Sequence, residues 1–408
     1  MGEYQYYEFL AIDRPLTEAE QKAVSCLSSR VEPHPWRAAF VYHWSDLPVD
    51  PEKLLAQYYD AMLYMANWGS RRLMFRFPRA LLDADRVRPY TVGSDEFGTS
   101  LSLSQVGEYV FLNIEFREVN QGEWLEGEGW LDRLVGLRED LLRQDDRLLY
   151  LAWLKGVADR EVDEEQPEPP VPPGLRSLSP ALRGFVELFD VDTDLLAIAA
   201  ERSGAPQAIS EEELRREIAA LSPQEKDEFL LRLARGEPLL SVVLNRRLAA
   251  LPGTTAPADE GRRTAGQLLA ARKALRERRR QERAAKAQAK RLAALEALAQ
   301  REDATWSEVE TLVATYQAKA YDEATRLLGQ LRELAAHRGQ EAAFAERLAR
   351  LAEKYQRRPS FMDRLRAAGL LPGTPSGRPG LPVDRRFAVL DEEEPEDDED
   401  TEDDDEAW

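Results

Sequence analysis

Dense apolar character is concentrated between Trp36 and Pro78, and this stretch constrains the fold more than any other part of the sequence. From Trp36 to Trp44 every second residue is aromatic or alanine, which predicts a strand buried mainly on one face. Because a half-buried strand needs a covering layer, the neighbouring segments must supply helices that pack against it. The stretch has no spacing typical of a catalytic motif, so we expect it to form a core.

The segment after this strand predicts a helix and then a second strand. Asp50 and Pro51 suit the N-cap and first turn, and Gly69 accepts the left-handed conformation of a helix C-cap. Apolar residues recur at helical spacing between these two ends. A strand from Arg71 to Phe77 then completes a β-α-β unit, which we expect to be right-handed.

Three further segments complete the predicted first domain. Residues 4–12 are aromatic enough for a strand, and a capping box that begins at Thr17 predicts a helix after it. Residues 101–104 and 109–118 indicate a hairpin that extends the sheet to about five strands, and residues 130–157 a closing helix. The expected fold class is α+β, with an N-terminal mixed sheet and packed helices, followed by an all-α C-terminal half and a disordered acidic tail.

Composition predicts where the chain divides. The acidic, proline-rich segment 159–177 is typical of an extended, semi-rigid linker, and the acidic end of the chain cannot bury enough surface to order itself. The predicted division is an α+β domain (1–158), this linker (159–177), a short-helix bundle (178–251), a linker with a basic exposed helix (252–301), a helical hairpin region (302–371) and a disordered acidic tail (372–408).

The formal net charge of -20 hides two blocks of opposite sign. Residues 391–408 hold fourteen acidic residues and no basic one, whereas residues 262–291 hold twelve basic residues and two acidic ones. From Arg276 to Arg291 no apolar side chain larger than alanine occurs, so this helix has little to bury. We expect it to be exposed to solvent or to a partner.

The basic helix supplies the candidate binding residues. One interpretation is a nucleic-acid site, in which Lys and Arg neutralise phosphates. A second is that the acidic tail, or another protein, lies on the helix and screens it; a third is a solvated helix or a coiled-coil arm. The candidates for polyanion or tail binding are Arg272, Lys273, Arg276, Arg278, Arg279, Arg280, Arg283, Lys286, Lys290 and Arg291.

The sequence predicts no cofactor, no metal and no catalytic residue. Cys26 is the single cysteine and there are three histidines, which excludes an internal disulfide and a thiolate-rich zinc site. His43 near Asp46 is the strongest acid-base candidate, and we interpret it as a structural or surface histidine. Five aromatic residues are expected in the core rather than around a ligand: Trp36, Trp44, Tyr58, Tyr59 and Trp68.

One segment imitates a calcium loop. Asp190, Asp192, Asp194 and Glu201 match four ligand positions of that loop, but Leu195 stands where glycine allows the sharp turn. The apolar residues that follow continue a helical pattern. We therefore expect the aspartates to cap a helix and to favour its positive end.

Two regions resemble known bacterial families. Residues 6–17 (YYEFLAIDRPLT) and 58–83 (YYDAMLYMANWGSRRLMFRFPRALLD) resemble an uncharacterised bacterial family of hypothetical proteins. Residues 221–237 and 321–370 are similar to the C-terminal helical region of bacterial SWIM-type zinc-finger proteins. The finger's Cys-x-Cys and Cys-x-His ligands are missing, so its metal and DNA binding do not carry over. The resemblance implies an architecture and no activity.

Together these features favour a non-enzymatic protein-interaction or scaffold protein. A protein partner is expected to bind through residues 252–371, with the acidic tail screening the basic helix. The alternative is a nucleic-acid-associated accessory protein that binds through residues 262–291. No run of about 18 apolar residues occurs, and the first ten residues lack the order of a signal peptide. We therefore expect no membrane partner and a cytoplasmic location.

Overall fold

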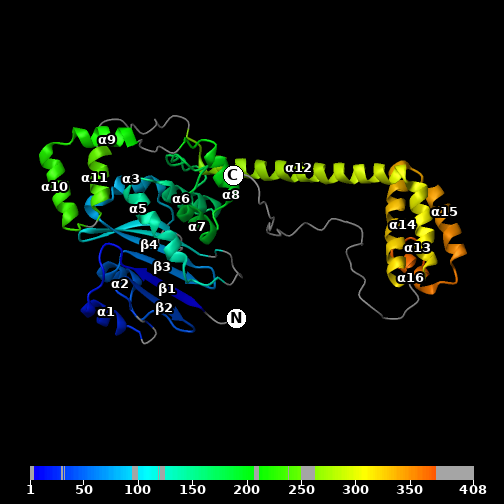
Figure 1. Cartoon of the computed structure of the whole chain (residues 1–408), viewed down its shortest axis with the longest axis horizontal. Coiled ribbons are helices and arrows are strands. Elements are labelled where there is room, and N and C mark those ends of the chain that lie inside the picture. The colour runs from blue at the N-terminus through cyan, green and yellow to red at the C-terminus, as the bar shows by residue number, and fades with distance from the viewer. Residues whose placement is uncertain are drawn as a thin grey trace. The chain divides into compact units, whose positions relative to one another are not determined.

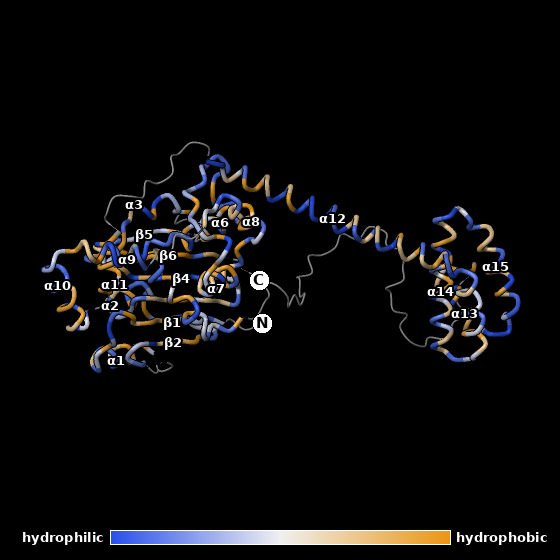
Figure 2. The backbone as a smooth tube through the Cα atoms, turned by 45° about the horizontal axis from the view of Figure 1, so that its top comes forward, coloured by the Kyte–Doolittle hydropathy of each residue, from blue (hydrophilic) through white to orange (hydrophobic). Residues whose placement is uncertain are grey.

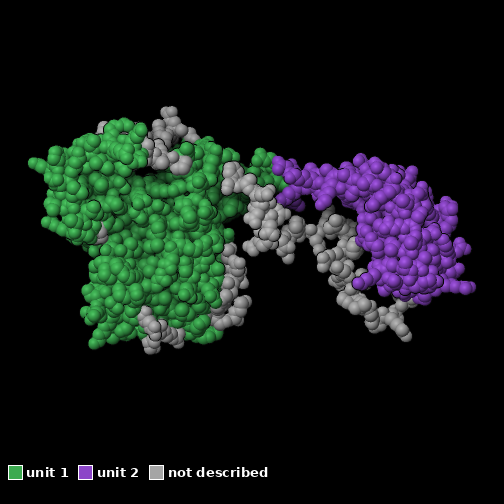
Figure 3. All heavy atoms as spheres, in the orientation of Figure 1, with its two compact units in different colours: residues 1–279 green, residues 280–408 purple. Residues whose placement is uncertain are grey.

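The chain divides into two compact units, unit 1 (Met1–Arg279) and unit 2 (Arg280–Trp408), which Figure 3 shows in different colours. The division lies inside one long helix and not in the proline-rich segment 159–177, where we expected a boundary. Residues 374–408 of the predicted acidic tail lie outside the described residues. This computed structural model describes residues 4–28, 31, 33–93, 100–117, 119, 125–205, 211–237, 239–249 and 262–373.

A six-stranded sheet forms the centre of unit 1 (Figure 1). Its strands lie side by side in the order β2-β1-β3-β4-β6-β5, and each neighbouring pair is antiparallel. The predicted α+β class is confirmed, but the parallel pairing implied by a right-handed β-α-β unit is wrong. The strands are β1 (Gln5–Leu10), β2 (Arg37–Tyr42), β3 (Ala61–Ala66), β4 (Arg71–Pro78), β5 (Ser100–Val106) and β6 (Tyr109–Phe116).

The helix predicted from Asp50 to Gly69 is wrong in its second half. Helix α2 (Pro51–Tyr58) begins as expected, because the Asp50 carboxylate accepts a hydrogen bond of 2.9 Å from the backbone N–H of Glu52. The following residues form β3, which pairs with β1 and β4. Five of its six residues are buried, so this strand lacks the apolar-polar alternation that indicates a strand in a sequence.

Helices cover both faces of the sheet. Helices α1 (Glu18–Ser25) and α2 pack on one face, where Phe9, Phe40 and Met74 contribute to the core. The predicted capping box at the start of α1 is present. The other face packs against α4 (Trp130–Leu134), α5 (Gly136–Leu142), α6 (Arg147–Ala158), α7 (Pro180–Leu188) and α8 (Thr193–Ala200).

The single helix predicted over residues 130–157 is three helices, α4, α5 and α6. The chain turns between α5 and α6 at Gln144, whose φ of 68° lies in the left-handed region. Helix α6 is buried from Leu148 to Val157, which explains its nearly continuous apolar sequence. Three short helices follow β4: the 3-10 helix η1 (Arg79–Leu81), the α-helix α3 (Ala84–Val87) and the 3-10 helix η2 (Arg88–Tyr90).

The proline-rich segment packs within unit 1 instead of separating two domains. Val162, Glu168 and Leu175 are buried there. After α8, the short-helix region contains α9 (Glu211–Ala220), α10 (Pro223–Ala234) and α11 (Leu240–Ala249). A capping box formed by Ser222 and Glu225 begins α10.

Helix α12 (Ala265–Gln300) begins in unit 1 and ends in unit 2. Hydrophilic residues dominate its middle (Figure 2). Leu295 and Leu298 in its last turns join the core of unit 2, to which Trp306 and Phe361 also belong. The predicted helical hairpin is formed by α13 (Glu302–Ala314) and α14 (Ala318–Arg338), with α15 (Glu341–Lys354) and α16 (Pro359–Ala367) packed against α14.

Candidate interaction surface on helix α12

The first turn of α12 is anchored by the proline-rich segment. Backbone N–H groups of Ala265 and Gly266 donate to the carbonyl oxygens of Gln166 and Glu164 at 3.0 and 2.9 Å. A Cβ at position 266 would lie 3.1 Å from both the Cβ and the carbonyl oxygen of Glu164. Glycine therefore permits the close approach of the two backbones.

A buried ion pair strengthens this anchor. The Glu168 side chain is 2% exposed and accepts hydrogen bonds of 2.8 and 2.9 Å from Arg263, and a third from the Tyr150 hydroxyl. Burial and the Glu168 carboxylate both raise the pKa of Tyr150, so the phenol stays protonated and remains a donor. Arg263 also donates to the Ile198 carbonyl at 3.2 Å. The Arg263 side chain is 13% exposed, so removing either partner leaves a largely buried charge without its counter-ion.

The next turns of α12 bind two carboxylates at the start of α8. Arg272 donates to Asp192 at 2.8 Å, and Arg276 reaches Asp192 at 3.0 Å and Asp194 at 2.8 Å. Arg279 also contacts Asp194. Burial alone would raise the pKa of Asp192, but hydrogen bonds from Arg272 and from backbone N–H outweigh it, so the pKa is lowered. We call Asp192 and Asp194 the acidic pair.

The segment that imitates a calcium loop contains the same two aspartates, and in the structure they lie at the start of α8. Asp192 is the N-cap of α8, and its carboxylate accepts from the backbone N–H of Asp194 and Leu195 at 2.9 and 3.0 Å. The predicted capping role is confirmed. Across the described residues, no cluster of three or more His, Cys, Asp and Glu side chains could hold a metal ion.

The arginines bound by the acidic pair begin a longer row of cations. Basic residues recur along α12 at alternating intervals of four and three residues. At about 3.6 residues per turn, these positions fall within an arc of about 80° on one helix face. We call this the cationic row: Arg272, Arg276, Arg279, Arg283, Lys286 and Lys290.

The second half of the cationic row has different surroundings. Arg283, Lys286 and Lys290 are exposed, and within the described ranges no carboxylate lies at ion-pair distance from them. Arg280 borders the row and is also exposed. The remaining three candidates lie off this face: Lys273, Arg278 and Arg291, the last paired with Glu333 of α14.

The other sequence candidates are not brought together as a site. The ring of His43 packs against Tyr4 at 5.7 Å between centroids, and Asp46 accepts a hydrogen bond of 2.7 Å from the Tyr7 hydroxyl. Tyr59 is buried as expected. The expectation that all five aromatic residues lie in the core is wrong, because three are well exposed: Trp36 (45%), Trp44 (70%) and Trp68 (42%).

Sequence reasoning found the cations but missed their carboxylates. Asp192 precedes Arg272 by eighty residues, so no local pattern connects them. Glu168 lies in the segment that the sequence predicted to be an acidic linker, so its burial was not expected. One feature of the sequence could have indicated these partners. Arginines at the start of α12 stand among apolar residues that pack in unit 1, so carboxylates from unit 1 were to be expected near them.

Comparison with known proteins adds no relative: no family model, curated protein or solved structure matches the chain. The resemblance to SWIM-type helical regions therefore stays a prediction. In the part of the chain that the structure describes, no helix combines the length and apolar character needed to cross a bilayer.

Proposed function

We propose that this chain is a non-enzymatic interaction protein that binds an acidic segment of a protein partner through the exposed half of the cationic row. The observation that carries this proposal is the acidic pair on the other half. Two aspartates, two residues apart, bind three arginines over two helical turns there. Arg283, Lys286 and Lys290 continue the same face, with the same spacing and no such partner among the described residues.

A short acidic segment suits this surface in size and chemistry. Arg283 and Lys290 are separated by about 10 Å along the helix axis, a distance that three or four extended residues span. Guanidinium and ammonium groups form charge-assisted hydrogen bonds with carboxylates. The surface has few apolar side chains, so we expect salt-sensitive binding with fast association.

The chain carries one such segment itself, residues 391–408. In the proposed mechanism this acidic tail competes with a partner for the row, because an attached segment has a high effective concentration. The tail thereby regulates access, and a partner must present more or better-placed carboxylates to displace it. The tail and the partner would both bind the cationic row through carboxylates, and neither interaction involves a catalytic step.

Nucleic acid is the competing interpretation, since phosphates also bind arginine and lysine. The cationic row has no aromatic residue within it, so it offers no platform for stacking bases. The acidic pair shows that this face of the helix binds carboxylates. We therefore treat nucleic acid as an outcome of the test.

The test measures fluorescence anisotropy of a labelled peptide of residues 391–408, and of labelled mixed-sequence DNA and RNA. Each probe is titrated with the full chain and with a variant that ends at Val389, at low and moderate salt. We expect the shortened variant to bind the peptide at least tenfold more tightly than the full chain. Tighter binding of DNA or RNA than of the peptide, if it is lost when Arg283, Lys286 and Lys290 are changed to Glu, would replace our proposal with the nucleic-acid function.

A matched pair of charge reversals locates the binding. The variant Arg283→Glu/Lys286→Glu/Lys290→Glu, made in the chain ending at Val389, should weaken peptide binding at least tenfold. The control Arg216→Glu/Lys319→Glu/Arg357→Glu changes the net charge equally at exposed positions outside the row. It should change affinity less than threefold at moderate salt. Equal losses in both variants, or no binding of any probe at low salt, would refute the proposal.

A further inference from the structure

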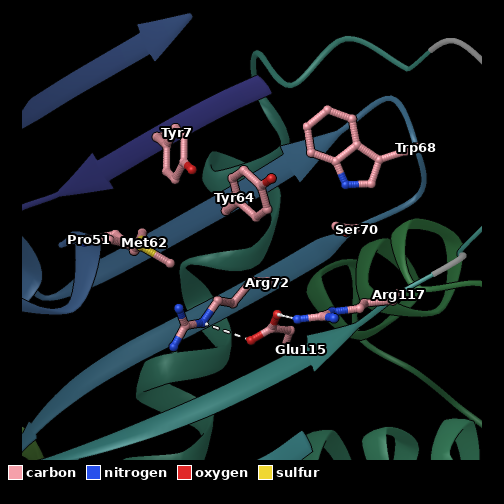
Figure 4. A pocket seen from close by; sticks show the side chains of 9 residues that line it. All are labelled: Tyr7, Pro51, Met62, Tyr64, Trp68, Ser70, Arg72, Glu115 and Arg117. Carbon is pink, nitrogen blue, oxygen red and sulfur yellow. Dashed lines mark ion pairs between the residues drawn. The ribbon is translucent and has the colours of Figure 1, made fainter. Parts of the chain in front are cut away.

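A second site lies on the sheet of unit 1, far in sequence from α12. Beside the first residue of α2, side chains on the sheet face line a pocket of about 550 Å³ (Figure 4). This volume is within the range of about 300–1,000 Å³ that is usual for small-molecule sites. The pocket does not include His43, which sequence analysis singled out.

Strand register builds the floor of this pocket. Tyr7 of β1 pairs with Tyr64 of β3, Tyr64 with Arg72 of β4, and Arg72 with Glu115 of β6. Directly opposed residues project to the same face of a sheet, so these four side chains form one row across four strands. The row changes from aromatic at one end to charged at the other (Figure 4).

The aromatic end offers fixed ring faces. The rings of Tyr7 and Tyr64 are 4.5 Å apart and tilted by 33°. The Tyr64 hydroxyl donates to Gln5 at 2.9 Å, and the Tyr7 hydroxyl to Asp46 at 2.7 Å, which holds both rings in place. Burial raises the pKa of Tyr64 to about 12, so the phenol is neutral at physiological pH. Trp68, in the turn after β3, stands at the side of the pocket and is half-exposed.

The charged end keeps unused hydrogen-bonding capacity. Arg72 is held by Asn113 at 2.6 Å, by Glu115 at 3.4 Å and by Glu52. Among the described residues, the ion-pair contacts of Glu115 are long, 3.4 Å to Arg72 and 3.9 Å to Arg117, so its oxygens can accept further hydrogen bonds. The Arg117 side chain is 56% exposed and can donate.

The charges of these groups cancel. Glu52 and Glu115 balance Arg72 and Arg117, so this end of the pocket favours neither a strong anion nor a cation. A carboxylate beside a guanidinium instead matches a ligand with neighbouring N–H donors and carbonyl or ring-nitrogen acceptors on one edge. Ser70, which also lines the pocket, adds a hydroxyl that both donates and accepts.

We propose that this pocket binds a planar nitrogen heterocycle of the nucleobase type. Its ring stacks on Tyr64 beside Trp68, its N–H edge donates to Glu115, and its acceptor atoms take hydrogen bonds from Arg117 and Ser70. Stacking supplies affinity and the charged edge supplies selectivity. The same chemistry occurs in a free nucleoside and in an unpaired base of RNA.

Isothermal titration calorimetry of the full chain with guanosine, adenosine, cytidine and uridine tests this proposal. We expect submillimolar binding of at least one nucleoside, and a preference for those carrying an amino group. A single-stranded RNA tetramer containing the preferred base distinguishes the two sources. Tenfold tighter binding of the tetramer identifies RNA, and equal or weaker binding identifies the free nucleoside.

Single substitutions locate the site. Trp68→Ala and Glu115→Gln should each weaken binding at least fivefold, and circular dichroism checks that both variants fold. Trp44→Ala is the matched control, because Trp44 is more exposed than Trp68 and lies outside the pocket. No nucleoside binding, or equal affinities in all three variants and the wild type, would overturn the proposal. Since Arg283→Glu/Lys286→Glu/Lys290→Glu should leave nucleoside binding unchanged, failure here is distinguishable from failure of the proposed function.

Discussion

The two halves of the cationic row share a sequence pattern and differ in their surroundings. In the first half, Arg272, Arg276 and Arg279 form ion pairs with the acidic pair. These contacts help to pack α12 in unit 1. In the second half, Arg283 and its two successors are exposed, without a carboxylate partner among the described residues. The same residue types thus serve packing at one end of a helix and remain accessible at the other.

This difference shows what a block of charge in a sequence can and cannot indicate. A run of basic residues predicts an exposed helix only where no distant acid occupies it. The partners of the first half are Asp192 and Asp194 at the start of α8, which precede the arginines by eighty residues or more. The accessible surface is therefore smaller than the basic run, and its location depends on tertiary contacts.

The largest expected effect concerns the buried anchor at the start of α12. Glu168→Gln keeps the size of the side chain but leaves the buried Arg263 charge without its carboxylate. We expect the free energy of unfolding of unit 1 to fall by about 3 kcal/mol. Urea denaturation followed by tryptophan fluorescence measures this.

The double variant Glu168→Gln/Arg263→Met is the control for this anchor. It removes both charges, so it should lose less stability than Glu168→Gln alone. A single variant within about 0.5 kcal/mol of wild type would mean that the ion pair does not hold α12.

The second prediction concerns the acidic pair. Asp192→Ala removes an N-cap and two arginine contacts, so we expect a loss of about 2 kcal/mol. Hydrogen exchange should accelerate in residues 265–279 and stay unchanged in residues 283–294. Asp85→Ala, which breaks an exposed pair with Arg88, should cost less than about 0.5 kcal/mol. Faster exchange along the whole of α12 would contradict a division of the row into two halves.

Local signals in the sequence predicted the helix starts correctly. The capping box at Thr17 and the aspartate caps at Asp50 and Asp192 each depend on residues within one turn. Strand β3 was mistaken for helix, because burial on both faces removes the alternation that marks a strand. Parallel pairing was expected wrongly for the same reason, because the β-α-β unit depended on that misplaced helix. The antiparallel hairpin of β5 and β6 was predicted correctly.

The candidate site was only half predictable. Composition indicated the ten basic residues, but not which of them meet Asp192 and Asp194, because that depends on how α8 and α12 pack. The pocket on the sheet was missed altogether. Tyr7, Tyr64 and Glu115 come together only through strand register across β1, β3, β4 and β6, which no short stretch of sequence encodes.

The third prediction separates the charge of Asp192 from its capping role. Asp192→Asn keeps a good N-cap and loses the charge, so near pH 7 we expect a deficit of about 1 kcal/mol relative to wild type. The arginine contacts lower the pKa of Asp192 in the folded chain below its unfolded value of about 3.9. Its contribution is therefore complete above that unfolded value and is lost as the pH falls through the lowered pKa.

Urea denaturation of wild type and Asp192→Asn between pH 7 and pH 2.5 tests this sign. The deficit should shrink on acidification, because wild type loses the carboxylate that the variant already lacks. A deficit that grew as the pH fell would contradict the prediction, because it would mean that the ionised carboxylate of Asp192 destabilises the folded chain. The second half of the row has no such carboxylate among the described residues, so it should show no matching dependence in this range.

The smallest expected effect compares equivalent cations in the two halves. Arg272→Ala should cost about 1 kcal/mol, because it leaves Asp192 with a weaker set of donors. Arg283→Ala should change the free energy of unfolding by less than about 0.5 kcal/mol, since alanine favours helix and the substitution removes like-charge repulsion. The same small value is expected in the chain that ends at Val389, because a tail held by exposed, salt-screened charges adds little to folding stability. Equal costs at positions 272 and 283 would mean that the second half is as firmly occupied as the first, and its cations would then be unavailable to a partner.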